Sequence, residues 1–219
     1  MKKTCAKEAL KFIKDNSVIG LGGGSTISYL VDFIKEANLN VEIVTPSFNT
    51  ELLCVKQGLK VIPTWSVDKI SVAFDGCDEV DNNLNALKSG GGIHTKEKII
   101  AKMADDYILL VDESKVSPAL TFKYPVVLEI FEESLSYVEK EVKKLGGSTS
   151  MRKSSAKDCF TISDHGLLLM DVNFDKVDSI KNLDNALRNI TGVVDTSLFY
   201  NIATKALVVS ENGIRVIEK

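Results

Sequence analysis

The chain has 219 residues, of which 44% are hydrophobic and 26% charged, and its formal net charge is −3 at pH 7. These values are typical of a soluble globular protein with one large domain, or one domain with a smaller insert. No basic run marks a nucleic-acid or membrane surface, and no stretch of about 18 apolar residues predicts a membrane span.

The first 124 residues alternate between helical and strand patterns. Helices are predicted around Cys5–Ile13 and over residues 22–38, 49–58 and 96–104. Strands are predicted over residues 17–22, 41–47, 60–65, 70–76 and 107–114. This alternation predicts a doubly wound, mostly parallel, Rossmann-like sheet, and such sheets bind ligands beyond the carboxyl ends of their strands.

The pattern changes after Pro125. Strands are predicted over residues 126–131, 148–152, 167–172 and 193–200, and helices over 132–147 and 177–192. The order βαββαβ predicts an inserted ferredoxin-like α+β domain. Two further strands meet at Asn212-Gly213, a strong hairpin signal. We therefore predict a catalytic domain over residues 1–124, an insert over 125–199, and C-terminal strands over 200–219 that return to the first sheet.

Cysteines and histidines limit the redox and metal chemistry. The four cysteines, at positions 5, 54, 77 and 159, form no CxxC pair, which predicts free thiols in a reducing, cytoplasmic environment. Only His94 and His165 are present, so a histidine-rich metal site is excluded. The first twenty residues have the pattern of an amphipathic helix and not of a signal peptide.

The stretch "GLGGGST", Gly20 to Thr26, joins a predicted strand to a helix. Glycine lets the backbone approach a ligand closely, and a helix N-terminus offers free N–H groups to an anion. Phosphate binding is therefore favoured over a merely structural turn. A dinucleotide site is less favoured because the third glycine of its fingerprint is missing and Thr45-Pro46 stand where an acidic residue would close the second strand.

The stretch "DGCDEVD", Asp75 to Asp81, has four carboxylates in seven residues. Alone it would be a solvated acidic loop. Its place after an apolar strand, shortly before Lys88, favours hydrogen bonds to sugar hydroxyls or proton transfer instead. Carboxylates alone can also hold magnesium, which leaves a metal site as a third interpretation.

The stretch "LKSGGGIHTKEKI", Leu87 to Ile99, combines a lysine, a glycine triplet and the start of a helix. The N–H groups of Gly90 and Gly91, with the Lys88 ammonium, could receive a developing enolate oxygen. Thr95 is the predicted N-cap of the helix. Glu97 in its first turn is ordinarily a surface residue that favours the helix dipole, but beside an oxyanion site it is a candidate base.

In order and spacing, "GLGGGST", "DGCDE", "KSGGGIHTKEKI" and "DESK" closely resemble ribose-5-phosphate isomerase of the A type, and the resemblance covers the whole chain. It implies Glu97 as the catalytic base. It implies substrate contacts at Gly23, Gly24, Ser25, Thr26, Asp75, Gly76, Cys77, Asp78, Lys88, Ser89, Gly90, Gly91 and Lys115. This sequence departs from the family pattern at Ser89, His94, Lys96 and Cys77.

The resemblance implies interconversion of ribose 5-phosphate and ribulose 5-phosphate through an enediolate, in the non-oxidative branch of the pentose phosphate pathway. Asp75 is expected to assist ring opening and Lys88 to stabilise the enediolate, with no cofactor and no metal. A homodimer that binds neither nucleic acid nor membrane is expected. The two alternatives are a sugar-phosphate sensor on the same fold and an acyl-CoA transferase-type enzyme with a glutamate nucleophile.

Overall fold

A computed structural model describes residues 1–155 and 158–219, and its largest element is a seven-stranded sheet. The strand order is β15-β14-β7-β4-β1-β2-β3, and every neighbouring pair is parallel except β14 and β15. The strands are β1 (Ser17–Leu21), β2 (Val41–Val44), β3 (Lys60–Val61), β4 (Ile70–Asp75), β7 (Ala104–Asp112), β14 (Lys205–Ser210) and β15 (Gly213–Glu218). The predicted doubly wound, mostly parallel sheet is confirmed.

Helices cover both faces of this sheet. On one face lie α1 (Lys2–Ala9), α2 (Ser25–Glu36) and α3 (Phe48–Lys56), and α4 (His94–Met103) packs on the other. The apolar spacing of α2 explains its position, since Ile27, Leu30, Val31 and Ile34 are all fully buried against the strands. Short 3₁₀ turns occur at Leu10–Phe12, Thr64–Ser66, Glu113–Lys115 and Glu132–Ser134.

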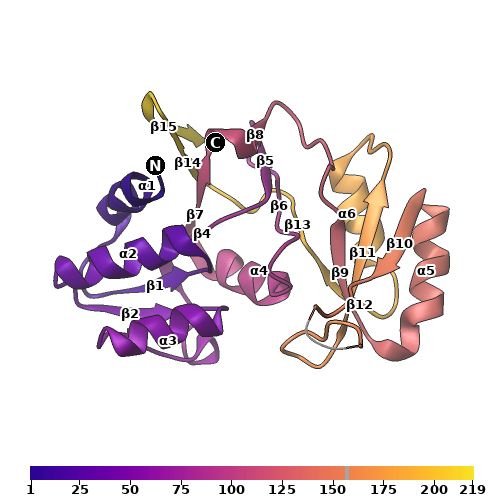
Figure 1. The fold of residues 1–219 in the computed structure, drawn as a ribbon, viewed down its shortest axis with the longest axis horizontal. Coiled ribbons are helices and arrows are strands. Elements are labelled where there is room, and N and C mark those ends of the chain that lie inside the picture. The colour runs from indigo at the N-terminus through magenta and orange to yellow at the C-terminus, as the bar shows by residue number, and fades with distance from the viewer. Residues whose placement is uncertain (156–157) are drawn as a thin grey trace.

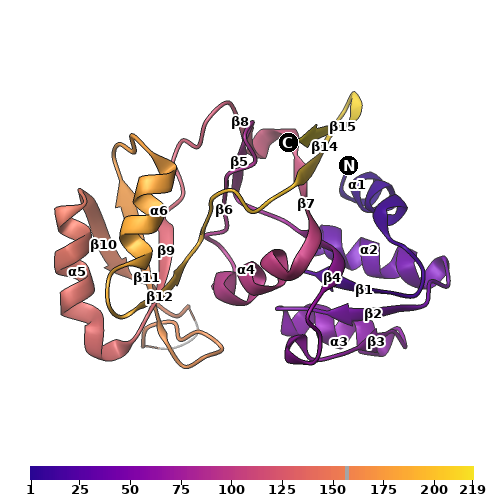
Figure 2. The same cartoon turned by 180° about the vertical axis from the view of Figure 1, so that it is seen from behind.

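A second, antiparallel sheet has the order β10-β11-β9-β12. Its strands are β9 (Val126–Ile130), β10 (Gly147–Met151), β11 (Leu168–Phe174) and β12 (Val193–Thr196), and its helices are α5 (Leu135–Lys144) and α6 (Ile180–Arg188). The chain order βαββαβ agrees with the ferredoxin-like α+β fold that the sequence predicts. Figure 1 and Figure 2 show this sheet and its helices on the other side of α4 from the seven-stranded sheet.

A small third sheet, which the sequence does not predict, lies between the two. It has the order β13-β6-β5-β8, with β5 (Glu79–Asp81), β6 (Ala86–Leu87), β8 (Val116–Ser117) and β13 (Leu198–Phe199). The predicted single strand over residues 193–200 is wrong, because its two halves pair in different sheets: β12 with β9, and β13 with β6. Strands of two or three residues carry too little pattern to be recognised locally.

Two further local predictions differ from the structure. The strand predicted over residues 60–65 is only β3, because the chain turns at Pro63 into a 3₁₀ turn. Helix α4 begins at His94 with Ile93 as its N-cap, so the prediction of Thr95 as N-cap is wrong. The Thr95 hydroxyl instead donates to the carboxylate of Glu129 on β9. The division of the chain at residues 124/125 and 199/200 stays a prediction.

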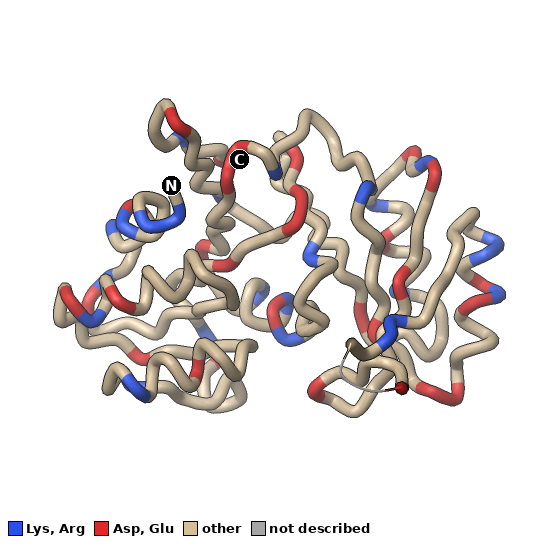
Figure 3. Tube along the Cα trace, viewed as in Figure 1, with Lys and Arg blue, Asp and Glu red and all other residues tan. Residues whose placement is uncertain are grey.

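Charged residues of both signs are distributed along the whole chain, as Figure 3 shows. Within residues 1–155 and 158–219, no helix combines the length and apolar character needed to cross a lipid bilayer.

Candidate active site

The strands β1, β2, β4 and β7 run parallel, so the loops that follow them meet at one edge of the sheet. A cavity of about 520 Å³ opens there. Its lining includes ten residues that the sequence analysis singles out, namely Gly23, Gly24, Asp75, Gly76, Cys77, Asp78, Lys88, Gly91, Glu97 and Lys115. The structure thus brings residues of all four sequence motifs to one site.

Lys88 connects the two carboxylates at the base of this cavity. Its Nζ lies 3.0 Å from Asp75 Oδ2 and 3.3 Å from Glu97 Oε1, and it also donates to the Gly76 carbonyl. All three charged side chains are at most 9% exposed. Such a buried group of one cation and two anions is costly to assemble and is characteristic of sites that transfer protons.

Burial and charge shift the ionisation of these groups. Burial raises the pKa of Glu97 to about 8, and the nearby Asp75 carboxylate adds to this while Lys88 opposes it. Burial alone would lower the pKa of Lys88, but the carboxylates of Asp75 and Glu97 outweigh it and hold that pKa above its ordinary value. Lys88 is therefore a cation, and the Glu97 carboxyl group has a pKa close to neutral pH, so that it can both accept and return a proton.

Asp75 ends strand β4 and accepts hydrogen bonds from several directions. Its Oδ1 accepts from the Gly76 N–H at 2.8 Å and from the Gly23 N–H at 3.4 Å, and its Oδ2 accepts from the Tyr107 hydroxyl at 3.3 Å. A Cβ added at Gly22 would come within 2.0 Å of Asp75 Oδ1. Glycine at position 22 is therefore required for the carboxylate to sit against the first loop.

A smaller cavity of about 160 Å³ adjoins the first and shares Gly23, Gly24, Gly76 and Lys115 with it. Ser25 and Thr26, in the first turn of α2, line this smaller cavity. Gly24 is the N-cap of α2 with φ of 92°, which favours glycine. Free N–H groups and hydroxyls at a helix N-terminus suit an anion such as phosphate.

Sequence reasoning missed several residues of the two cavities. Lys2 lines the smaller one, where its Nζ lies 2.9 Å from Ser25 Oγ. The larger one is also lined by Ser47, Phe48, Asn49, Ile93 and Asp164. Lys2 is 23 positions from Ser25 and Asp164 comes from the second sheet region, so no local motif could have associated them with the site.

Two residues of the predicted oxyanion loop do not face the cavity as expected. The Ser89 hydroxyl donates to the Pro125 carbonyl at 2.5 Å. The Gly90 N–H donates to Asp78 Oδ2 at 2.9 Å and is thus already used within the protein. The Gly91 backbone lines the cavity. Of the two N–H groups predicted to receive an enolate oxygen, only that of Gly91 is available.

Two of the four clustered carboxylates have structural roles. Glu79 accepts from the Ser117 hydroxyl and the Thr121 N–H, and Asp81 accepts from Asn83 and Asn85 in a tight turn. Neither lines the cavity. Within the described ranges no three His, Cys, Asp or Glu side chains are grouped to hold a metal ion, so the alternative of a metal held by Asp75, Asp78 and Asp81 finds no support in their arrangement.

Neither His94 nor Lys96, two of the departures from the family pattern, lines the larger cavity. His94 is 1% exposed, and burial lowers the pKa of its ring to about 4. Lys96 forms an ion pair with Asp164, with 2.8 Å between Nζ and Oδ2. Neither removes a group from the site.

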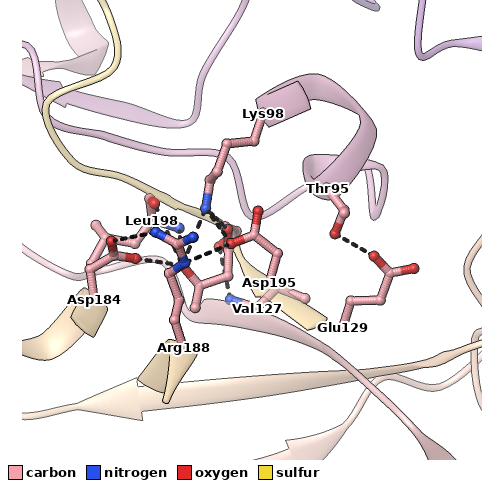
Figure 4. A network of polar contacts seen from close by, with 10 residues as sticks. Thr95, Lys98, Val127, Glu129, Asp184, Arg188, Asp195 and Leu198 are labelled. Atoms are coloured by element: carbon pink, nitrogen blue, oxygen red, sulfur yellow. Dashed lines mark hydrogen bonds and ion pairs between the residues drawn. The ribbon is translucent and has the colours of Figure 1, made fainter. Parts of the chain in front are cut away.

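A polar network holds helix α4, and with it Glu97, against the second sheet (Figure 4). The Lys98 ammonium, 4% exposed, donates to Asp195 Oδ1 at 2.9 Å and to the Thr196 carbonyl at 2.5 Å. Arg188 Nε lies 3.6 Å from the same Asp195 oxygen. Because Lys98 follows Glu97 directly, this buried ion pair limits the movement of the turn that carries the candidate base.

Comparison with known proteins shows the family of the chain. Residues 42–213 match the family model of ribose 5-phosphate isomerase A (phosphoriboisomerase A). The chain is 38% identical to ribose-5-phosphate isomerase A of Pyrococcus abyssi, over 100% of this chain and 98% of that one, and 36% identical to that of Synechococcus sp., over 99% and 95%.

Solved structures agree as well. Ribose 5-phosphate isomerase A from Methanocaldococcus jannaschii superposes with a TM-score of 0.93 at 32% identity, covering 100% of this chain and 98% of that one. A D-ribose-5-phosphate isomerase in complex with phospho-erythronic acid superposes with a TM-score of 0.94 at 35% identity, covering 100% and 97%. With the family model, the full-length relatives and the shared fold in agreement, the chain belongs to the ribose 5-phosphate isomerase A family.

Proposed function

We propose that this chain interconverts D-ribose 5-phosphate and D-ribulose 5-phosphate, with Glu97 as the base. The observation that carries the proposal is the buried contact of Lys88 with both Glu97 and Asp75 beside a glycine-rich helix N-terminus. The complex of a related isomerase with phospho-erythronic acid, a phosphorylated acid, supports a phosphosugar as ligand.

In this proposal the phosphate binds at Ser25 and Thr26, where the α2 N–H groups, Lys2 and Lys115 supply positive charge. The sugar extends from there into the larger cavity, towards Asp75, Lys88 and Glu97. Asp75 accepts the proton of the anomeric hydroxyl, the bond between C1 and the ring oxygen breaks, and Asp75 returns the proton to that oxygen, which gives the free aldehyde. The Gly76 and Gly23 N–H groups and the Tyr107 hydroxyl hold the Asp75 carboxyl group in place for this transfer.

Proton transfer then follows on the open-chain sugar. Glu97 removes the C2 proton, the C2 electron pair forms the C1–C2 double bond, and negative charge develops on O1. The Lys88 ammonium and the Gly91 N–H stabilise this oxygen; one well-placed donor of this kind contributes about 3–4 kcal/mol. Glu97 returns the proton to C1 while the O2 proton passes to O1, which gives the ketose.

The test is the formation of ribulose 5-phosphate from ribose 5-phosphate without added cofactor. We expect Glu97→Gln to lower kcat at least about 100-fold with a nearly unchanged binding constant, because the amide keeps the shape but cannot accept the proton. Glu113→Gln, at an exposed glutamate paired with Arg215, is the matched control. A Glu97→Gln variant that keeps a third of kcat would exclude Glu97 as the base. Tight binding by the wild type without turnover would indicate a sensor instead.

We further propose a cytoplasmic homodimer. Four free cysteines, three of them buried, support a reducing compartment, and the family resemblance supports the dimer. Light scattering after size-exclusion chromatography should give twice the 24.0 kDa chain mass; a mass equal to one chain would contradict the dimer.

A further inference from the structure

Arg152, just after β10, reaches the glycine loop that follows Lys88. Its Nη2 donates to the Ser89 carbonyl at 2.8 Å, and its Nη1 to the Gly90 carbonyl at 3.3 Å. Asp171 on β11 holds the guanidinium, accepting from Nε at 3.1 Å and from Nη2 at 2.5 Å. The Arg152 side chain is 18% exposed. A planar guanidinium can bind two neighbouring carbonyls and a carboxylate at once, which an ammonium cannot do in the same geometry.

These contacts determine which way two peptide groups face. In a trans peptide the C=O of one residue and the N–H of the next point in opposite directions, and the described residues contain no cis peptide. With the Ser89 carbonyl turned to Arg152, the Gly90 N–H points away from it, and there it meets Asp78 at 2.9 Å. The Gly90 carbonyl and the Gly91 N–H belong to the next trans peptide, so with the Gly90 carbonyl facing Arg152 the Gly91 N–H points away from Arg152.

The side away from Arg152 is the side of the substrate cavity. Asp78 and Gly91 both line that cavity, whereas Arg152 does not. Two successive N–H groups that face one side form a small anion-binding concavity. Asp78 accepts from the first N–H of this pair. The second belongs to Gly91, which lines the cavity, and it has no hydrogen-bond partner among the described residues.

The glycine triplet contributes few contacts that could keep this loop in one conformation. Gly90, Gly91 and Gly92 have no side chains to pack, and glycine populates many backbone conformations. Gly92 has φ of 68°, and a Cβ there would come within 2.8 Å of Leu169 Cδ1 on β11. The loop therefore depends on neighbouring groups for its peptide orientation, and of the residues that the structure describes, Arg152 donates to two of its carbonyls.

We propose that Arg152 is a positioning residue for the reaction: by binding the Ser89 and Gly90 carbonyls, it aims the Gly91 N–H at the oxygen on which charge develops. The inference rests on the proposed isomerase function. Asp171 neutralises the guanidinium, so Arg152 acts by fixing geometry and contributes little charge of its own to the substrate.

The test compares Arg152→Ala with Arg215→Ala, which removes an exposed arginine paired with Glu113. We expect Arg152→Ala to lower kcat about 10- to 100-fold, the scale of a misdirected oxyanion donor, with KM changed less than about threefold since Gly91 contacts the substrate mainly as charge develops. Millimolar guanidinium should restore part of kcat in Arg152→Ala. It should not raise kcat in Arg215→Ala.

A binding measurement adds an independent readout. Phospho-erythronic acid has one carbon fewer than the substrate, so aligned on the phosphate its carboxylate carbon takes the place of C2 and its two anionic oxygens stand in for O1 and O2 of the enediolate. Its affinity should therefore fall about tenfold in Arg152→Ala. The affinity for inorganic phosphate, which needs only the α2 loop, should stay within about twofold. Equal loss for both ligands would overturn the proposal, because it would indicate general damage to the site.

The remaining outcomes separate this inference from the proposed function. If the wild type does not isomerise ribose 5-phosphate, both the proposed function and this inference are contradicted. If the wild type is active but the kcat of Arg152→Ala lies within twofold of the wild-type value, the positioning role of Arg152 is contradicted and the proposed function is not. The same holds if Arg152→Ala changes only KM. If Arg152→Ala does not fold, Arg152→Lys keeps the charge but not the planar fork, and the same loss of kcat at constant KM is expected. An unchanged kcat in Arg152→Lys would overturn the proposal.

Discussion

The Lys88 ammonium lies between the carboxyl groups of Glu97 and Asp75 and attracts both. Glu97 and Asp75 both lie within 3.3 Å of it, in a part of the cavity almost closed to water. Burial dominates over this attraction for Glu97, whose pKa lies above the ordinary value of 4.5. The balance between burial, which raises the pKa of Glu97, and the attraction of Lys88, which lowers it, determines the pH at which the base is active.

The pH profile of kcat/KM should therefore rise through the pKa of Glu97. The base must be deprotonated, so activity is low below this pKa and increases as pH rises through it. Because burial raises that pKa to about 8, the acidic limb should lie well above 4.5. The measurement is kcat/KM against pH, with circular dichroism at each pH to confirm the fold. A limb near 4.5 would contradict a desolvated base.

Cys77 provides a second prediction at the residue scale. It is 5% exposed and lines the larger cavity, and burial raises the pKa of its thiol to about 12. The carboxylates of Asp75 and Asp78 add to this shift only as smaller effects. Thiol reagents react with the thiolate, so inactivation should be slow, accelerate with pH and be prevented by saturating ribose 5-phosphate.

The exposed Cys159 would react first, so the experiment belongs in a Cys159→Ser background. In that background Cys77→Ala should keep its activity and resist the reagent, since the thiol has no assigned chemical role. Inactivation of Cys77→Ala at the parent rate, or no protection by substrate, would show that this loop does not contact the sugar.

At the scale of elements, α4 depends on the second sheet as much as on the first. Ile100 and Ala101 pack against the seven-stranded sheet, while Lys98 is paired with Asp195 near the end of β12. The Phe199 ring on β13 contacts the ammonium groups of Lys88 and Lys98, with its centroid 5.7 Å from Lys88 Nζ and 5.1 Å from Lys98 Nζ. The helix that carries the base is thus held between the two sheets.

We expect Lys98→Met to lower the free energy of unfolding by about 3 kcal/mol, because it leaves the buried Asp195 carboxylate with only the more distant Arg188. For a chain of this length the melting temperature should fall by about 6–12 °C. Lys102→Met, at an exposed position of the same helix, should stay within about 0.5 kcal/mol. Equal melting temperatures for the two variants would contradict a stabilising role of the Lys98 pair.

At the scale of the whole molecule, the two main sheets share core and polar contacts. The core of the second sheet includes Leu87 of β6 and Leu198 of β13, which belong to the small sheet between them. The Lys88 N–H donates to the Ser197 carbonyl at 3.0 Å, directly beside the candidate active site. Loss of either main sheet would expose apolar surface and leave buried polar groups of the other without partners.

We therefore expect the chain to unfold as one cooperative unit. Hydrogen exchange should show that peptides from β4 and from β11 lose protection at the same denaturant concentration. Loss of protection in β11 at clearly lower denaturant, with β4 still protected, would show that the second sheet unfolds independently.

The sequence by itself determined the fold class and the motifs. Alternating strand and helix periods, glycine at the first strand–helix turn, and an acid after a buried strand are local properties, so residues such as Gly24, Asp75 and Glu97 could be selected from their immediate neighbours. Convergence of the loops after β1 and β4 could also be predicted, since the carboxyl ends of parallel strands meet at one edge. Glu97 reaches that edge on α4, which follows β6 of the small third sheet.

The tertiary structure alone decided how the site is assembled. Glu79 and Asp81 resemble Asp75 and Asp78 in sequence, but the small third sheet turns their side chains towards Ser117 and Asn85 and away from the cavity. Arg152 acts on Ser89 across more than 60 residues. The direction of a peptide group in a glycine loop depends on the partners that bind its carbonyl, and those partners come from strands that are adjacent only in the folded chain.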